Sequence, residues 1–141
     1  MLSFRSLLAV VTLVAGLLVV GCSHAPKPSR PAGPGIGGTV IYITNATLPA
    51  DATVEVRLVE LNREGRVERE VTSTSYPRPA AMPLEFWLPY QAGLIDQHQS
   101  YGLEAKITSN GRILFTTTRP IPVLTKGNPK NVEAVVVPAQ R

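Results

Sequence analysis

Hydrophobic and polar residues alternate in short runs from Thr39 to the end of the chain. The clearest run is 53–59, where Val54, Val56 and Leu58 alternate with charged residues. A period of two places successive side chains on opposite faces of a β-strand. The same pattern recurs at 84–90 and 101–107. These three segments are therefore predicted strands, each with one buried face.

Shorter β-branched runs, separated by Gly, Pro, Asn and Asp, predict further strands at 39–44, 67–76, 113–118 and 132–137, and the pair Val123-Leu124 leads into a turn. Residues 67–76 are polar on both faces, as expected of an exposed edge strand. Asn110-Gly111 lies between two runs and predicts a tight hairpin. Residues 92–99 suit one helical turn, and there is no room for crossover helices. We therefore expect an all-β domain, a single antiparallel β-sandwich of seven to eight short strands.

The N-terminus has a different pattern. Arg5 precedes an apolar run, 7–20, with the length of the hydrophobic region of a secretory signal peptide. The run ends at Val19-Val20-Gly21-Cys22, which resembles a bacterial lipobox, in which the cysteine thiol is acylated and the preceding bond is cleaved. We therefore predict cleavage between Gly21 and Cys22 and lipidation of Cys22. The alternative is an ordinary cleaved signal or a buried cysteine.

Between the signal peptide and the first predicted strand, the chain is rich in proline and glycine. Residues 23–38 contain a single large aliphatic side chain, Ile36, and so offer too little apolar surface to fold. Three parts are predicted: a lipoprotein signal peptide at 1–21, the acylated cysteine with a tether at 22–38, and the β-sandwich at 39–141.

Charge excludes a nucleic-acid-binding surface. The whole chain has 14 Lys and Arg against 10 Asp and Glu, but Arg5, Lys27 and Arg30 precede the predicted domain. From Thr39 onward, 11 basic residues therefore face 10 acidic ones, without a block of one sign. Cys22 is the only cysteine, so the domain is expected to be stable through packing, without a disulfide.

The sequence contains few candidate catalytic or metal-binding residues. Asp96 and His98 are close in sequence and could pair or ligate a metal, but two ligands make a poor metal site. A role in capping a surface turn is the favoured interpretation. The other histidine, His24, lies in the tether. We expect no catalytic residues, no metal site and no cofactor, with an unrecognised hydrolase site as the weakest alternative.

Trp87 is the candidate for partner binding. In 84–90, Leu84, Phe86 and Leu88 share one face, while Glu85 and Trp87 share the other, which the alternation places outside. A loop or the proline-rich segment 77–83 could cover the indole. The alternative is that Trp87, with Glu85 beside it, anchors an extended segment of a partner along an edge strand.

Several stretches resemble the lipoprotein family typified by YbaY, which is grouped with the YscW pilotin lipoproteins of type III secretion. The similar segments are 38–42 with Leu48-Pro49, 83–90 with Ile95-Asp96, 101–107, 111–115 and 122–127. The resemblance covers the domain from Gly38 to the C-terminus. It implies a small β-sandwich facing the periplasm and, for the pilotin branch, binding to a secretin that travels with it to the outer membrane.

The resulting prediction is a non-enzymatic lipoprotein at the periplasmic face of the outer membrane, which binds a secretin or another envelope protein as a chaperone or pilotin-like adaptor. Ser23 follows Cys22, and the absence of Asp there favours the outer membrane under the enterobacterial sorting pattern. The alternative is a structural or accessory envelope lipoprotein that binds glycan or has no dedicated partner.

Overall fold

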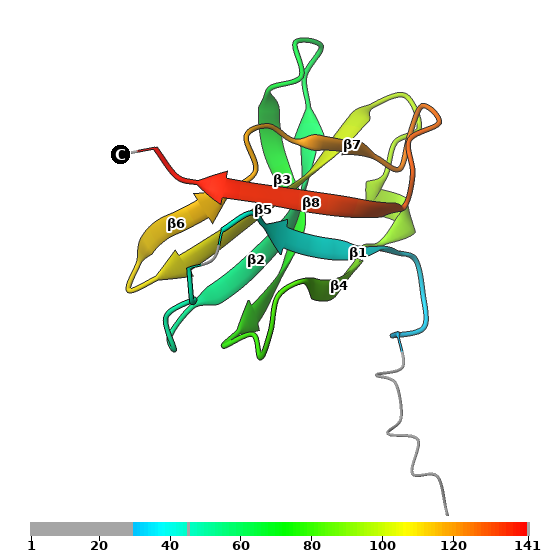
Figure 1. Ribbon diagram of the computed structural model, residues 1–141. Helices are drawn as coiled ribbons and strands as arrows, with labels where there is room; N and C mark the ends of the chain where they lie inside the picture. Colours follow the sequence, from blue (N-terminus) through cyan, green and yellow to red (C-terminus); the bar gives the residue numbers. More distant parts are fainter. Residues whose placement is uncertain (1–29, 45, 141) are drawn as a thin grey trace, which may run out of the picture.

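The computed structural model describes residues 30–44 and 46–140, whose regular secondary structure is β-strand apart from one 3₁₀ turn (Figure 1). The elements are β1 (Gly35–Tyr42), β2 (Thr53–Leu61), β3 (Val67–Pro77), β4 (Leu84–Pro89), the 3₁₀ turn η1 (Ala92–Leu94), β5 (Ser100–Ser109), β6 (Arg112–Thr116), β7 (Ile121–Val123) and β8 (Asn131–Pro138). The predicted all-β class and the number of strands are confirmed. No helix in these ranges is long and apolar enough to cross a membrane.

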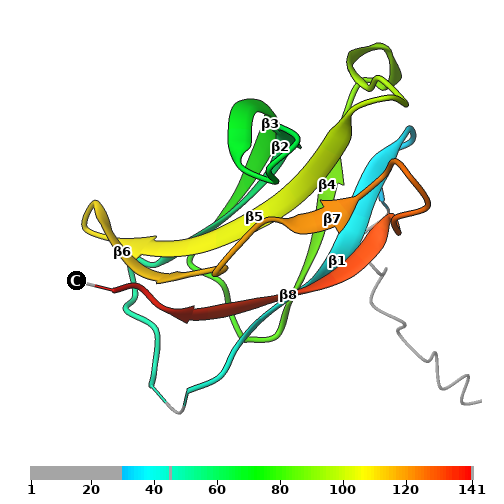
Figure 2. The same ribbon diagram turned by 90° about the horizontal axis from the view of Figure 1, so that it is seen from above.

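One mixed sheet folds over on itself and nearly closes. Its strand order is β3-β2-β5-β6-β8-β1-β4, and β7 pairs with β5 beside this path. Figure 2 shows the short β6 at one end of the domain, where it pairs with both β5 and β8. The two ends of the order, β3 and β4, are edge strands, as their sequences predict.

The core lies between the two layers. Side chains predicted to point inward do so: Val54, Val56 and Leu58 of β2 are 0% exposed, and β5 contributes Leu103 and Ile107. Ile36 of β1 and Val136 of β8 pack into the same cluster from the other side. Burial of apolar surface from both layers is the main stabilising contribution.

The pairing of β1 with β8 differs from the prediction of a wholly antiparallel sandwich. Gly37 pairs with Asn131 and Tyr42 with Val136 in a parallel register, whereas all other strand pairs are antiparallel. Parallel neighbours need a long connection, and here that connection is the rest of the domain. Because the first and last strands run in the same direction, β1 begins at one end of the sheet and the chain terminates at the other (Figure 1).

β1 begins at Gly35, four residues before the strand predicted from Thr39. Gly35–Gly38, assigned to the tether from composition, therefore form part of the sheet. At Gly38 a Cβ atom would overlap the Val132 carbonyl oxygen of β8 and lie 2.9 Å from two atoms of the Phe86 ring. This glycine is needed because β1 passes close to both neighbours at that point.

The β5–β6 hairpin has the turn that Asn110-Gly111 predicts. Both residues have positive φ, 48° and 73°, as a two-residue type I′ turn requires. Asp51, from the β1–β2 loop, accepts hydrogen bonds from the Ser109 hydroxyl (2.8 Å) and the Asn110 N–H (2.9 Å). The hydrogen bond from Ser109 is the main cause that lowers the pKa of the Asp51 carboxyl below its ordinary value.

Replacing Gly38 with alanine tests the close approach of β1. The added Cβ would meet a backbone oxygen, so β1 and β8 have to separate, and we expect Gly38→Ala to lower the free energy of unfolding by about 1–3 kcal/mol. The control is Gly93→Ala, because a Cβ at Gly93 meets nothing within 4 Å, and its expected change is below about 0.5 kcal/mol. Urea denaturation measures both, and equal effects of the two variants would contradict the packing argument.

Candidate functional site

The indole of Trp87 lies against the backbone of β1, where that strand has glycines. Trp87 is opposite Gly37 in the antiparallel β1–β4 register. A Cβ at Gly35 would overlap the indole atoms Cζ2 and Cε2, and a Cβ at Gly37 would lie 3.5 Å from Cε3. The two glycines therefore make room for the ring on the outer side of the sheet. As a result, Trp87 is half-buried rather than exposed.

Arg30, from the segment before β1, packs over the ring. Its guanidinium carbon lies 5.2 Å from the centroid of the Trp87 ring, within the range of a cation–π interaction. A side chain that covers Trp87 therefore comes from the segment before β1, whereas the sequence suggested a loop or the segment 77–83. The indole Nε1 atom is buried and has no hydrogen-bond partner among the described residues.

The backbone of Trp87 is also occupied. The Tyr76 hydroxyl of β3 accepts a hydrogen bond from the Trp87 N–H (2.8 Å) and donates one to the Trp87 carbonyl (3.0 Å). One hydroxyl thus satisfies the donor and the acceptor that a neighbouring strand would otherwise pair. This bridge joins β3 to β4, the two ends of the strand order, and nearly closes the sheet into a barrel.

The Tyr76 bridge leaves little of the β4 edge open for strand addition. The Gly37 N–H bonds to the Lys130 carbonyl (2.9 Å) on the β8 side, so the backbone groups of Trp87 face away from β1. Hydrogen-bonding positions alternate along an antiparallel pair, so the backbone N–H and C=O of Glu85 point to the same open side as those of Trp87. Pro89, two residues after Trp87, has no N–H to donate. The open backbone groups of this edge are therefore chiefly those of Glu85.

Side chains on the outer side of β4, β1 and β8 form a surface that we call the Trp87 face. The register gives its two rows: Trp87, Gly37 and Asn131 are opposite one another, and Glu85, Thr39 and Glu133 form the next row. Glu85 and Glu133 are exposed. Neither glutamate forms an ion pair with a basic residue in the described ranges. The structure thus places both predicted partner-binding residues, Trp87 and Glu85, on one face.

Asp96 and His98 lie in the loop after η1. The Asp96 carboxylate accepts a hydrogen bond from the His98 backbone N–H (2.8 Å), which confirms the predicted turn cap. Nowhere in residues 30–44 and 46–140 do three or more His, Cys, Asp or Glu residues form a group that could hold a metal ion. Cys22, Gly21 and His24 lie outside the described residues.

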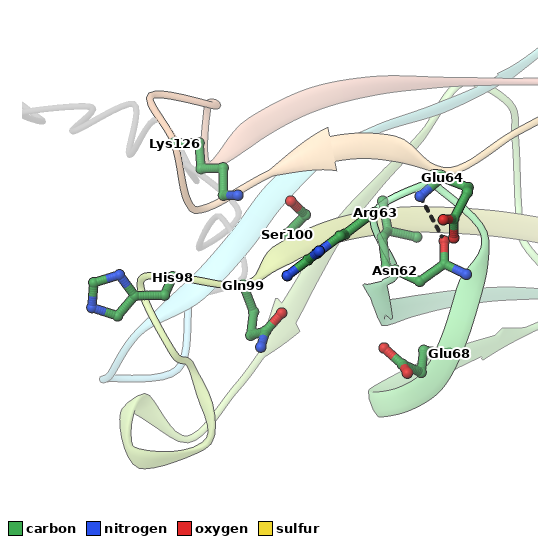
Figure 3. A pocket seen from close by; sticks show the side chains of 9 residues that line it. Asn62, Arg63, Glu64, Glu68, His98, Gln99, Ser100 and Lys126 are labelled. Carbon is green, nitrogen blue, oxygen red and sulfur yellow. Dashed lines mark hydrogen bonds between the residues drawn. The ribbon is translucent and has the colours of Figure 1, made fainter.

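His98 also borders an open hollow of about 630 Å³ (Figure 3). The hollow lies between the β2–β3 turn, the loop before β5 and the β7–β8 turn, and its lining includes both cations and carboxylates, namely Arg63, Lys126, Glu64 and Glu68. Figure 3 shows these polar side chains spread around the rim instead of converging on one point. Such a lining is typical of a solvated surface.

The comparisons with known proteins identify the family. The model of the family described as "Type III secretion system lipoprotein chaperone (YscW)" matches residues 32–136, from just before β1 into β8. The chain belongs to the YscW family. The YscW part of the predicted resemblance is confirmed, and the YbaY grouping remains a prediction. No curated protein matches this YscW-family chain.

A solved structure shares the fold of this YscW-family domain. It is described as "Structure of an alternative pilotin from the type II secretion system of Vibrio cholerae". The match covers 77% of this chain and 98% of that chain, with a TM-score of 0.70 and 24% sequence identity. At this level of identity the likeness establishes a common fold only.

Three contributors to the site were missed in the sequence: the glycines at the start of β1, Tyr76 and Arg30. The early start of β1 could have been found, because Ile36 continues the period of two from Val40. Tyr76 ends a polar edge strand, and no local pattern indicates that its hydroxyl reaches Trp87. Arg30 lies in a segment without periodicity, so its contact with the indole depends on the tertiary structure alone.

Tyr76→Phe tests the bridge between the two edge strands. The variant keeps the ring but leaves the Trp87 N–H and carbonyl without their protein partner, so we expect the free energy of unfolding to fall by about 1–3 kcal/mol. The matched control is Tyr42→Phe, which loses an exposed hydrogen bond to the Ala46 carbonyl and should cost less than about 0.5 kcal/mol. Chemical denaturation compares the two variants. A similar loss of unfolding free energy in both would show that the bridge contributes no more to stability than an exposed hydrogen bond.

Proposed function

We propose that this YscW-family protein is a lipid-anchored, non-catalytic chaperone of pilotin type. It holds a segment of a secretin or another envelope protein at the periplasmic face of the outer membrane. The family match carries the proposal, because it spans 32–136 and so nearly the whole folded domain. The secretin as partner comes from the pilotin branch of the family resemblance, and the fold shared with a solved pilotin is consistent with it.

The anchor and the tether set where the domain can act. Acylation of Cys22 after cleavage at Gly21 would hold the chain at the membrane, and stable anchoring takes two or more acyl chains. Since β1 begins at Gly35, the tether is the segment 22–34. At about 3.1 Å per residue, this segment reaches about 40 Å when extended. The domain therefore samples only a thin layer of periplasm next to the membrane.

The Trp87 face is the proposed contact for the partner. A large aromatic side chain with an exposed polar rim is typical of an interface anchor, and Glu85 supplies the rim. The Tyr76 hydroxyl holds the backbone of β4 at Trp87. A partner segment would therefore contact side chains of this face, instead of adding a full strand to the edge. This arrangement supports binding and offers no reacting groups.

Photo-crosslinking in living cells tests for a dedicated partner. A photoreactive amino acid in place of Glu85 should capture one protein reproducibly, which mass spectrometry identifies, and we expect a secretin. Trp87→Ala in the same background should lower the yield severalfold while the β-sheet circular dichroism is retained.

The control position is Glu68, which is also exposed and lies on β3 in the other layer. It should give no specific product. The absence of any reproducible product at Glu85, or the same products at both positions, would favour the alternative of a structural envelope lipoprotein without a dedicated partner.

Replacing Cys22 tests the anchor. In Cys22→Ala the thiol that accepts the lipid is absent, and with it the cleavage before position 22 that depends on the cysteine, so we expect the protein to leave the outer-membrane fraction for a soluble or inner-membrane fraction. A Ser23→Ala variant, which keeps the thiol, serves as the control and should stay in the outer membrane. Unchanged outer-membrane retention of Cys22→Ala would refute lipid anchoring.

A further inference from the structure

Four segments surround one end of the sheet, the end at which the chain enters β1. The register places Gly35 of β1 beside Pro89 of β4, and Leu61 of β2 beside Ser100 of β5, while the end of β7 pairs with the start of β5. Figures 1 and 2 both show the loop before β5 and the β7–β8 turn next to the start of β1. We call this end the tether end, and its segments are 30–34, 62–66, 90–99 and 124–130.

Cations gather at the tether end although they are dispersed along the sequence. Its four segments hold five of the 11 basic residues in 30–44 and 46–140, but only two of the 10 acidic ones. Both acids are engaged locally, because Glu64 pairs with Arg66 (3.7 Å) and Asp96 caps its own turn. Three of the cations are exposed and form no ion pair within the described ranges, namely Arg63, Lys126 and Lys130.

Exposed apolar side chains accompany these cations. Val67, directly after the 62–66 turn, is 43% exposed, and Leu94 in η1 is 46% exposed. Affinity for a lipid surface grows with buried apolar area and with attraction of cations to anionic headgroups. The opposite end of the sheet also exposes apolar residues, Ile43 and Ile113, so the charge and the attachment of the tether decide between the two ends.

The arrangement of the cations suits a surface with many separate anions. Figure 3 shows Arg63, His98 and Lys126 spread around the hollow between the β2–β3 turn and the β7–β8 turn. Side chains that point to separate places cannot enclose one small anion. They can each meet a different phosphate group of a lipid bilayer, in which the headgroups lie side by side.

Buried hydrogen bonds fix the loops of the tether end. The Thr125 hydroxyl donates to the Gln99 carbonyl (2.7 Å) and joins the β7–β8 turn to the loop before β5. The Tyr101 hydroxyl accepts a hydrogen bond from the Asp96 N–H (3.0 Å) and donates one to the Leu94 carbonyl (3.5 Å). Thr125 and Tyr101 are each 1% exposed. The tether end is therefore organised before it meets a ligand, which lowers the entropic cost of binding.

The length of the tether brings this end close to the membrane. Eight residue steps separate the predicted lipid-bearing Cys22 from Arg30 and span at most about 27 Å. β1 has eight residues and carries the chain about another 26 Å toward the opposite end. Of the two ends of the sheet, the tether end therefore reaches the bilayer more readily.

We propose that the tether end docks on a bilayer surface that contains anionic phospholipid. Arg63, Lys126 and Lys130 contact phosphate groups, and Leu94 enters the headgroup layer. The inference rests on the proposed function for the lipid anchor, and it adds the orientation of the domain. With this end on the membrane, the strands rise from the surface, and the Trp87 face on the side of the sheet stays open to a partner.

Fluorescence quenching tests the inference on the lipidated protein reconstituted in vesicles. Gly93→Cys places a thiol-reactive NBD label beside Leu94, and Ala80→Cys places it at the opposite end; both positions are exposed, and Cys22 is the only natural cysteine. The vesicles are phosphatidylcholine with a nitroxide quencher on the headgroup, with or without about 30% phosphatidylglycerol. With phosphatidylglycerol, we expect at least about threefold more quenching at position 93 than at position 80, and less than half of this excess in about 0.5 M NaCl.

Matched double variants separate the cations of the two ends. Lys126→Gln with Lys130→Gln removes two exposed cations from the tether end, and Arg78→Gln with Arg112→Gln removes two from the opposite end. We expect the first pair to lower quenching at position 93 about threefold or more in vesicles with phosphatidylglycerol, because each cation adds to the attraction of the anionic surface. The second pair should leave this quenching unchanged.

Equal quenching at positions 93 and 80, or quenching at position 93 that persists in Lys126→Gln with Lys130→Gln, would overturn the inference. An acidic surface of a partner protein would then be the better counterpart for these cations. Flotation of the same vesicles tests the anchor separately. Retention of the protein with equal quenching leaves the anchor standing and removes the docked orientation. Loss of the protein from the vesicles removes the anchor, and excess vesicles then still report docking through the label at position 93.

Discussion

The close approach of β1 to its two neighbours is the constraint on which the rest of the structure depends. β1 pairs with β4 on one side and with β8 on the other, so it joins the first and the last parts of the fold. Gly38 lies where a side chain would collide with the backbone of β8 and with Phe86. Without a glycine there, neither the parallel pair nor the near closure of the sheet could form at these distances.

The same glycine-rich start of the strand also shapes the face proposed to bind the partner. Gly35 and Gly37 leave space that the Trp87 ring fills from outside, so an aromatic side chain on the solvent side of the sheet becomes rigidly held. A held ring loses less conformational entropy on binding than a free one. The glycines at the start of β1 therefore allow the strands to approach closely and also hold the ring of the proposed partner-binding residue on the outside.

Closure by Tyr76 determines how this face can be used. Edge strands invite pairing with other chains, and the Tyr76 hydroxyl occupies the backbone of Trp87 at the place where β3 and β4 meet. Recognition is thereby left to side chains, and the contact with Arg30 connects it to the segment that leads to the predicted anchor. In this YscW-family protein, the arrangement would link the proposed membrane anchor to the proposed binding face.

Features that repeat locally along each strand could be predicted from the sequence. The alternation of Val54, Val56 and Leu58 predicted a buried face because period-two burial is a property of a single strand. Asn110-Gly111 predicted its turn because a two-residue hairpin turn requires positive φ at those two residues. Contacts in the folded domain were needed to show that the glycines before Thr39 belong to β1, that β1 and β8 run parallel, and that Tyr76 and Arg30 reach Trp87. These features depend on contacts between segments far apart in the chain, and a composition rich in glycine is the same for a tether as for a strand that must pass close to its neighbours.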